Sequence, residues 1–137
     1  ISGITKAAVE DSSSWLYKRI IVTTTCQSGV IYRHKVSPDH FTHCFIDEAA
    51  QVTEPESLIA ITLVALRQGA VILAGDHMQL GPVILSPHAK KYEFGISLME
   101  RLMSTEPYKR DSAMEKFGTY NPKCITKLII NYRTDGQ

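Results

Sequence analysis

The sequence has 137 residues, the length of one ordinary domain or of a piece of a larger protein. Its hydrophobic fraction of 44% is enough for a packed core and excludes a disordered tail, while its formal net charge of +1 gives no bulk attraction to nucleic acid. The three cysteines are far apart, which favours reduced thiols in a cytosolic or nuclear setting. No transmembrane segment is expected, because no stretch approaches the roughly 18 apolar residues that span a bilayer. The layout of a signal peptide is missing too, and we expect both termini to be cuts in a longer protein.

The first half of the chain alternates apolar runs with turn signals. Residues 1–18 form a weakly amphipathic lead-in, and the β-branched run from Arg19 to Thr25 predicts a buried strand. Turn signals at Ser28-Gly29 mark the segment 26–38, which we expect to be a loop. The apolar run 41–47 predicts the next strand.

The next segment has clear signals for the start and the end of a helix. Thr53 and Glu56 have the spacing of a capping box, Pro55 suits a first helical turn, and Gly69 is a natural stop. Residues 71–75 then predict a third strand, 96–103 a short helix, 104–122 a polar loop and 125–130 a fourth strand.

The order of these elements indicates an α/β fold. Strands that alternate with helices are joined by right-handed crossovers, which build a mostly parallel sheet with flanking helices. The strands are continuous apolar runs rather than alternating ones, as expected when helices cover both faces of a parallel sheet. In such sheets, ligands bind at the edge where the carboxyl ends of the strands meet.

Two acids follow the strand that ends near residue 46. Asp47 can hold a magnesium ion through its water shell, and Glu48, one residue on, can polarise an attacking water. An Asp-Glu dipeptide alone is weak evidence, because it also describes a strand end with two solvated acids.

A second polar loop follows the next strand, in the stretch GDHMQLGP at residues 75–82. Gln79 is a neutral amide at the same expected edge, where it can bind a terminal phosphate and a water together without adding charge. The pairing of DEAAQ at residues 47–51 with this second loop is far more specific than either stretch by itself.

Both stretches resemble known helicase motifs. DEAAQ resembles motif II of superfamily-1 helicases, GDHMQLGPV resembles motif III, and LIINYRT resembles motif IV. VTTTCQSG looks like the strand and loop that precede motif II in helicases of the nonsense-mediated-decay type. The sequence from Arg19 onward is similar to the Armitage and Moloney-leukaemia-virus-ten group of RNA helicases. Within that group it most resembles the Armitage-type branch, which acts in small-RNA pathways.

The resemblance implies a RecA-like sheet of the P-loop NTPase fold, with ATP as substrate and Mg2+ as cofactor. By this likeness Asp47 would hold magnesium, Glu48 would be the general base, and Gln79 would sense the terminal phosphate. Two later positions would complete the pocket: Tyr132 would stack on adenine and Arg133 would act as an arginine finger. The segment Thr23, Thr24, Thr25 and Cys26 would lie near the RNA backbone.

The sequence departs from the family pattern in two respects, one of which is that the later motifs of the second motor domain, with their second arginine, are absent. The phosphate-binding loop G-x-x-x-x-G-K-[ST] is also absent, since no glycine here precedes a lysine. We therefore expect residues 1–130 to be the rear part of a first RecA-like domain and residues 131–137 to begin a second. The fold would be incomplete, and this chain alone is expected to be inactive.

The implied function is part of an ATP-dependent RNA helicase that moves on single-stranded RNA and unwinds or remodels it. The family branch implies small-RNA (piRNA) silencing, partners from that pathway, and a cytoplasmic location in ribonucleoprotein granules near mitochondria. Two alternatives stay open from the residues. One is an inert RNA- or protein-binding module, which the missing loop favours; the other is a DNA helicase, because motifs II and III do not separate RNA from DNA.

Overall fold

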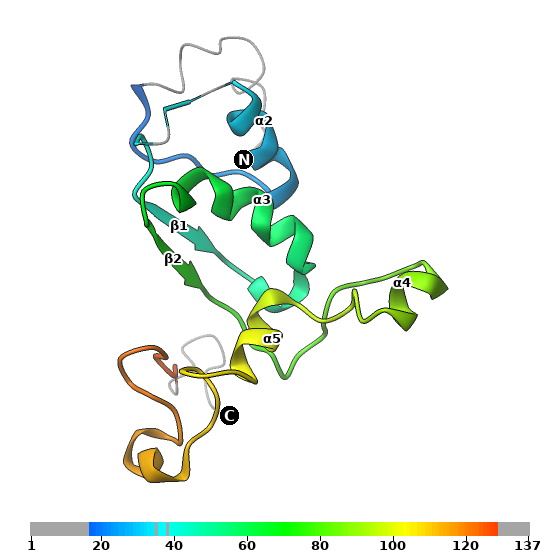
Figure 1. Ribbon diagram of the computed structural model, residues 1–137, viewed down its shortest axis with the longest axis vertical. Helices are drawn as coiled ribbons and strands as arrows, with labels where there is room; N and C mark the ends of the chain where they lie inside the picture. Colours follow the sequence, from blue (N-terminus) through cyan, green and yellow to red (C-terminus); the bar gives the residue numbers. More distant parts are fainter. Residues whose placement is uncertain (1–16, 35, 38, 129–137) are drawn as a thin grey trace, which may run out of the picture. The chain divides into compact units, whose positions relative to one another are not determined.

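The computed structural model describes residues 17–34, 36–37 and 39–128 (Figure 1). The chain forms two compact units that divide between Met99 and Glu100. This division falls within helix α5 (Leu98–Met103). Among the described residues, no helix has the length and apolar character that crossing a bilayer requires.

The first unit contains a β-α-β element. Strands β1 (His43–Ile46) and β2 (Ala70–Leu73) pair in parallel, with His43 opposite Ala70 and Ile46 opposite Leu73. Helix α3 (Glu54–Ala65) connects them (Figure 1). The strands predicted at 41–47 and 71–75 and the helix predicted between them are confirmed. The described part of the sheet has these two strands, so it shows a short parallel sheet and not a complete RecA-like one.

Helix α3 begins where its sequence predicts. The Thr53 hydroxyl oxygen accepts a hydrogen bond from the Glu56 backbone N–H, and the Glu56 carboxylate accepts one from the Thr53 backbone N–H. These bonds satisfy backbone donors that a helix start otherwise leaves open. At the other end, a Cβ at residue 69 would lie 2.8 Å from the Val64 Cβ, so Gly69 is needed because the chain passes close to the helix.

One face of the strand pair carries the core. Ile46 is 4% exposed and packs with Ala49 and Ala60, while Val64 of α3 is buried as well. Full burial of a side chain the size of Ile46 contributes about 1.5–3 kcal/mol. The opposite face is open in the described chain, since Phe45 is 73% exposed. The prediction that helices cover both faces is therefore met on one face only.

Helix α2 (Thr25–Arg33) replaces the strand end and loop that the sequence predicts. Thr24 caps it, because its hydroxyl oxygen accepts from the Gln27 backbone N–H at 3.2 Å. Ser28 is buried inside the helix, and Gly29 lies so close to α3 that a Cβ there would be 3.3 Å from the Ile59 side chain. The expected turn residues thus serve close helix packing.

Two predicted strands are wrong in their described parts. Residues 20–24 form no strand, and Ile20 and Val22 are exposed. Residues 125–128 form no strand either, and Leu128 is 89% exposed. A β-branched run becomes a strand only beside another strand that completes its hydrogen bonds, and neither run has such a neighbour among the described residues.

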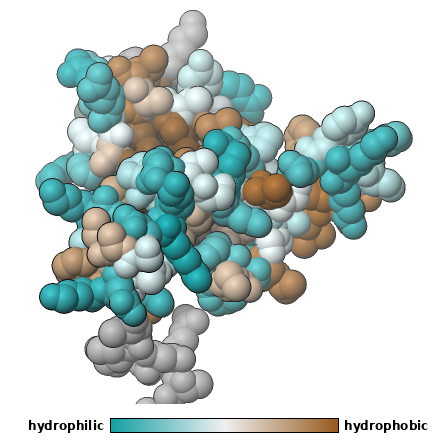
Figure 2. All heavy atoms as spheres, turned by 60° about the horizontal axis from the view of Figure 1, so that its bottom comes forward, coloured by the Kyte–Doolittle hydropathy of each residue, from teal (hydrophilic) through white to brown (hydrophobic). Residues whose placement is uncertain are grey.

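The remaining elements are short. Helix α4 (Pro87–Lys91) interrupts the loop after β2, α5 confirms the helix predicted at 96–103, and the 3-10 element η3 (Ser112–Phe117) lies in the predicted polar loop. Hydrophobic side chains break the hydrophilic surface in places (Figure 2), and the exposed ones include Leu80, Val83 and Leu85 after β2.

Candidate functional site

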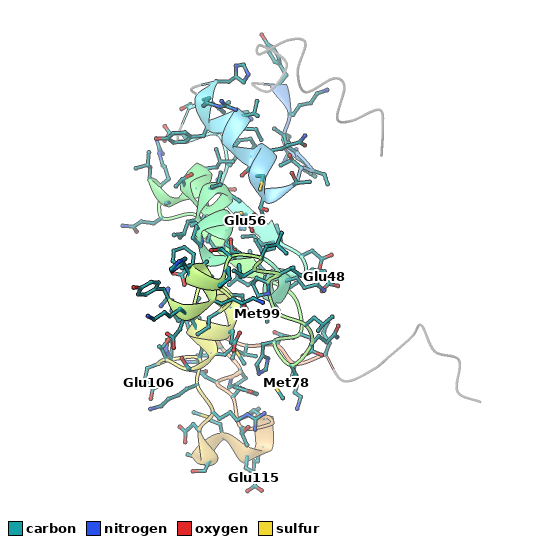
Figure 3. The ribbon with its side chains drawn as sticks, turned by 90° about the vertical axis from the view of Figure 1, so that its right-hand side faces the viewer. Glu48, Glu56, Met78, Met99, Glu106 and Glu115 are labelled. Atoms are coloured by element: carbon teal, nitrogen blue, oxygen red, sulfur yellow. The ribbon has the colours of Figure 1, made fainter. Side chains whose placement is uncertain are left out.

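The carboxyl ends of β1 and β2 stay joined one residue beyond the strands. The Ala74 backbone N–H donates to the Ile46 carbonyl at 2.9 Å, and the Ala49 backbone N–H donates to the Ala74 carbonyl at 2.8 Å. Asp47 and Glu48 therefore leave the sheet beside the chain that leads to Asp76. Figure 3 labels Glu48 and Met78, one from each loop, on the same side of the ribbon.

Gly75 makes this close approach feasible. Its φ of 152° lies in the region that residues with a side chain rarely adopt. A Cβ there would lie 3.1 Å from the backbone N of Ala49 and 3.3 Å from that of Ala50. Any larger residue would push the two loops apart.

Glu48 is held in a defined conformation at the end of β1. Its backbone is left-handed, with φ 52° and ψ 37°, and its N–H donates to Asp47 Oδ1 at 3.0 Å. The 3-10 turn that follows, η2 (Ala49–Gln51), brings Gln51 back over Glu48, and Gln51 Nε2 donates to Glu48 Oε2 at 3.3 Å. Both acids are exposed, so their oxygens are open to ligands from solvent.

Gln79 lies in the loop after β2, within the same edge of the sheet. Its side-chain Nε2 donates to Asp76 Oδ2 at 3.0 Å, and its backbone N–H donates to the Asp76 carbonyl at 3.1 Å. Asp76 Oδ1 accepts from the Met78 backbone N–H at 2.9 Å. The hydrogen bond from the Met78 backbone N–H, and to a smaller extent that from the Gln79 side chain, lowers the pKa of Asp76 below its ordinary value. The Asp76 carboxylate is therefore charged at neutral pH.

The predicted RNA-facing residues lie at the start of α2. Thr23 is exposed, Thr24 is the cap, and the Thr25 carbonyl accepts from the Ser28 hydroxyl. The Cys26 thiol donates to Glu56 Oε1 at 3.6 Å, which links this segment to the start of α3. Within the described residues, no hydrogen bond joins the segment to Asp47 or Glu48.

Tyr132 and Arg133 lie outside the described residues, so the adenine and arginine-finger assignments stay predictions. The roles assigned to Asp47, Glu48, Gln79 and residues 23–26 also stay predictions. The structure supplies their neighbourhood: it brings Asp47, Glu48 and the Gln79 loop to one edge.

The donor chemistry at this edge suits magnesium. Asp47 and Glu48 offer carboxylate oxygens, which Mg2+ prefers. Among the described residues, no cluster of three or more His, Cys, Asp or Glu side chains is placed to hold a metal. A site with one or two carboxylates is nevertheless the usual protein share for Mg2+, because phosphates and waters supply the other ligands.

Two polar residues hold proposed site residues through hydrogen bonds that the sequence interpretation did not predict, although it did expect the Asp76 carboxylate at this edge. Gln51 ends the DEAAQ stretch, and Asp76 begins the second loop. The signal that could have found both is their spacing, because each is three residues from the side chain that it holds. A 3-10 turn brings Gln51 and Glu48 together, and a turn closed by the Gln79 N–H and the Asp76 carbonyl does the same for the other pair.

Comparison with known proteins gives two findings. Residues 3–87 match the family described as AAA domain. The chain is 50% identical over 117 residues to RNA helicase Mov10l1 of Homo sapiens and 38% identical over 118 residues to "Probable RNA helicase armi" of Drosophila melanogaster. It is also 34% identical over 117 residues to "Probable helicase with zinc finger domain" of Danio rerio.

These matches cover 85%, 84% and 85% of this chain but only 10%, 10% and 6% of the three relatives. The chain thus spans about a tenth, or less, of the length of the proteins it resembles. The resemblance predicted from its motifs is confirmed over most of its length. The chain therefore belongs to the AAA domain family and corresponds there to a segment of superfamily-1 helicases of the Mov10l1 and Armitage group.

Proposed function

We propose that this chain is part of an ATP-dependent RNA helicase. In this proposal residues 1–130 are the rear part of a first RecA-like domain of the P-loop NTPase fold, and residues 131–137 begin the second. One observation carries it: the parallel strands β1 and β2 end side by side and lead directly into Asp47-Glu48 and the Gln79 loop. The relatives named helicases support the same assignment.

The chemistry assigned to this edge is ATP hydrolysis. Asp47 would hold Mg2+, which, bound with the triphosphate, would offset the charge that develops on the phosphates. Glu48 would take a proton from the attacking water, and Gln51 would hold its carboxylate in place. Gln79 would bind the terminal phosphate. From outside the described residues, Tyr132 would stack on adenine and Arg133 would reach the phosphate across the cleft.

The substrate proposed is single-stranded RNA, held in part by residues 23–26. Two relatives are named RNA helicases, which favours RNA over DNA, whereas the zinc-finger relative is named a helicase without a stated nucleic acid. The likeness to the Armitage branch supports work in small-RNA silencing, with partners from that pathway and a location in cytoplasmic granules near mitochondria.

A matched pair of substitutions tests the proposal in the helicase that contains this chain. Glu48→Gln removes the general base and should lower RNA-stimulated ATP turnover by about 10²–10⁴-fold, while ATP binding persists. Glu93→Gln is the control, because Glu93 is also an exposed acid with a left-handed backbone, at φ 61°, but lies beyond the strand ends.

The outcome separates the candidate functions. Equal turnover by the two variants would contradict the role of Glu48. A parent protein that binds RNA but hydrolyses no ATP would instead support the inert binding module. Unwinding of DNA with no activity on RNA would support the DNA helicase.

A further inference from the structure

Asp76 holds the loop after β2 through two separate oxygens. Oδ1 accepts from the Met78 backbone N–H at 2.9 Å and closes a turn, while Oδ2 accepts from Gln79 Nε2 at 3.0 Å. The first bond shapes the backbone, and the second acts on the Gln79 side chain alone. The two effects of one aspartate are therefore separable by substitution.

The second bond decides which way round the Gln79 amide lies. An ionised carboxylate only accepts hydrogen bonds, so the amide nitrogen of Gln79 must face Asp76 and the amide oxygen must lie on the other side of the group. Gln79 then keeps its carbonyl oxygen as an acceptor and one N–H as a donor. Those are the two functions needed to bind a water and a phosphate oxygen at once.

We propose that Asp76 is a positioning residue that fixes the orientation of the Gln79 amide at the nucleotide edge of the sheet. It rests on the proposed function in one respect, namely that Gln79 contacts the terminal phosphate. Asp76 acts through Gln79 and touches neither ATP nor water in the reaction.

The chain itself shows that asparagine can make the same turn. Asn121 Oδ1 accepts from the Lys123 backbone N–H at 3.0 Å, and Asp111 Oδ1 accepts from the Ala113 backbone N–H at 2.9 Å. Asp76→Asn should thus keep the bond to Met78. It would, however, set an amide nitrogen against Gln79 Nε2, two donors face to face, and Gln79 would turn over to offer its oxygen instead.

The kinetic test uses the helicase that contains this chain. Asp76→Asn should lower kcat by on the order of 10- to 100-fold, as expected for a misaligned catalytic group, with KM for ATP and thermal stability close to wild type. Asp111→Asn, the same change in a turn without a glutamine, should leave kcat unchanged. Added to Gln79→Ala, Asp76→Asn should cause no further loss, because its effect passes through Gln79.

Two kinetic results would overturn the proposal. One is a wild-type kcat in Asp76→Asn. The other is an equal loss from Asp76→Asn in the wild-type and Gln79→Ala backgrounds, which would assign Asp76 an effect of its own.

A second measurement needs no nucleotide. In the helicase that contains this chain, the glutamine side chains are labelled with nitrogen-15, and Gln79→Ala identifies the amide signal of Gln79. The Gln79 signal should differ from that of the exposed Gln68 and should move in Asp76→Asn but not in Asp111→Asn. A Gln79 signal that coincides with that of Gln68 would overturn the proposal. If the signals behave as expected while the wild-type helicase hydrolyses no ATP, the proposed function fails and the orientation of Gln79 by Asp76 stands.

Discussion

The two loops at the sheet edge use the same pair of groups in opposite roles. After β1, the acid Glu48 is the proposed reacting group and the amide of Gln51 holds it; after β2, the amide of Gln79 is the proposed reacting group and the acid Asp76 holds it. Both pairs are three residues apart. In the first loop the carboxylate is therefore the proposed reacting group and the amide positions it. In the second loop the amide is the proposed reacting group and the carboxylate positions it.

The loops also differ in how firmly they are attached. The first loop runs into the core, because Ala49 and Ala50 are buried and Thr53 caps α3 directly after it. The second loop is largely exposed from Ala74 to Gly81, and Asp76 is its own internal anchor. The first loop is thus held by the core, whereas the second depends on hydrogen bonds to Asp76 for its shape.

The largest expected effect comes from a substitution at the point where the two loops are in contact. Gly75→Ala forces a Cβ against the backbone of Ala49 and Ala50 at a strained φ, so it should lower the free energy of unfolding by about 1–3 kcal/mol. Gly81→Ala is the control, since a Cβ there meets only the Gly95 carbonyl oxygen at an ordinary 3.5 Å. Urea unfolding of both variants measures the difference, and equal midpoints would contradict the close approach.

The hydrogen bond that holds Glu48 can be removed by a single substitution. Gln51→Leu deletes the donor to Glu48 Oε2, and kcat should fall by about tenfold, the effect of one hydrogen bond of roughly 1.4 kcal/mol to a charged group. Gln68→Leu is the matched change at an exposed glutamine away from the edge. A kcat unchanged by Gln51→Leu would mean that the backbone of η2 positions Glu48 without help.

The attachment of the first loop to α3 can be weakened next. Thr53→Ala removes the cap and should destabilise the first unit by about 1 kcal/mol. Thr62→Ala, within the same helix, should be neutral, because the Thr62 hydroxyl bonds only to the Ile59 carbonyl one turn back. Thermal unfolding separates the two; a Thr62 variant that is less stable than the Thr53 variant would contradict the importance of the cap.

The smallest expected effect is a pH dependence of the same cap. The Thr53 hydroxyl lowers the pKa of Glu56 by donating to its carboxylate, so ionised Glu56 favours the folded state. Its stabilisation is complete above the unfolded-state pKa and is lost as the pH falls through the lower folded-state pKa. Glu56→Gln can still cap but does not titrate. Its melting temperature should therefore fall less on acidification than that of wild type, and parallel curves would contradict the assignment.

Local signals in the sequence determined the element that carries the site. The capping box at Thr53, the apolar runs of β1 and β2, and the acids that follow them each depend on residues within one turn or one strand, and the structure confirms these elements. The meeting of both loops at one edge also follows from the sequence, because parallel strands that share a crossover helix end on the same side.

Packing decided what the local signals could not. Ser28 and Gly29 indicate a turn in isolation, but burial of Ser28 and the close approach of Gly29 to Ile59 make them part of α2. Residues 20–24 have strand propensity but no partner strand within the described part of the chain, and a ladder needs two strands to complete its hydrogen bonds. The orientation of Gln51 and Gln79 likewise depends on which donor and acceptor the folded loops bring within 3.3 Å, and this is a property of three-dimensional geometry.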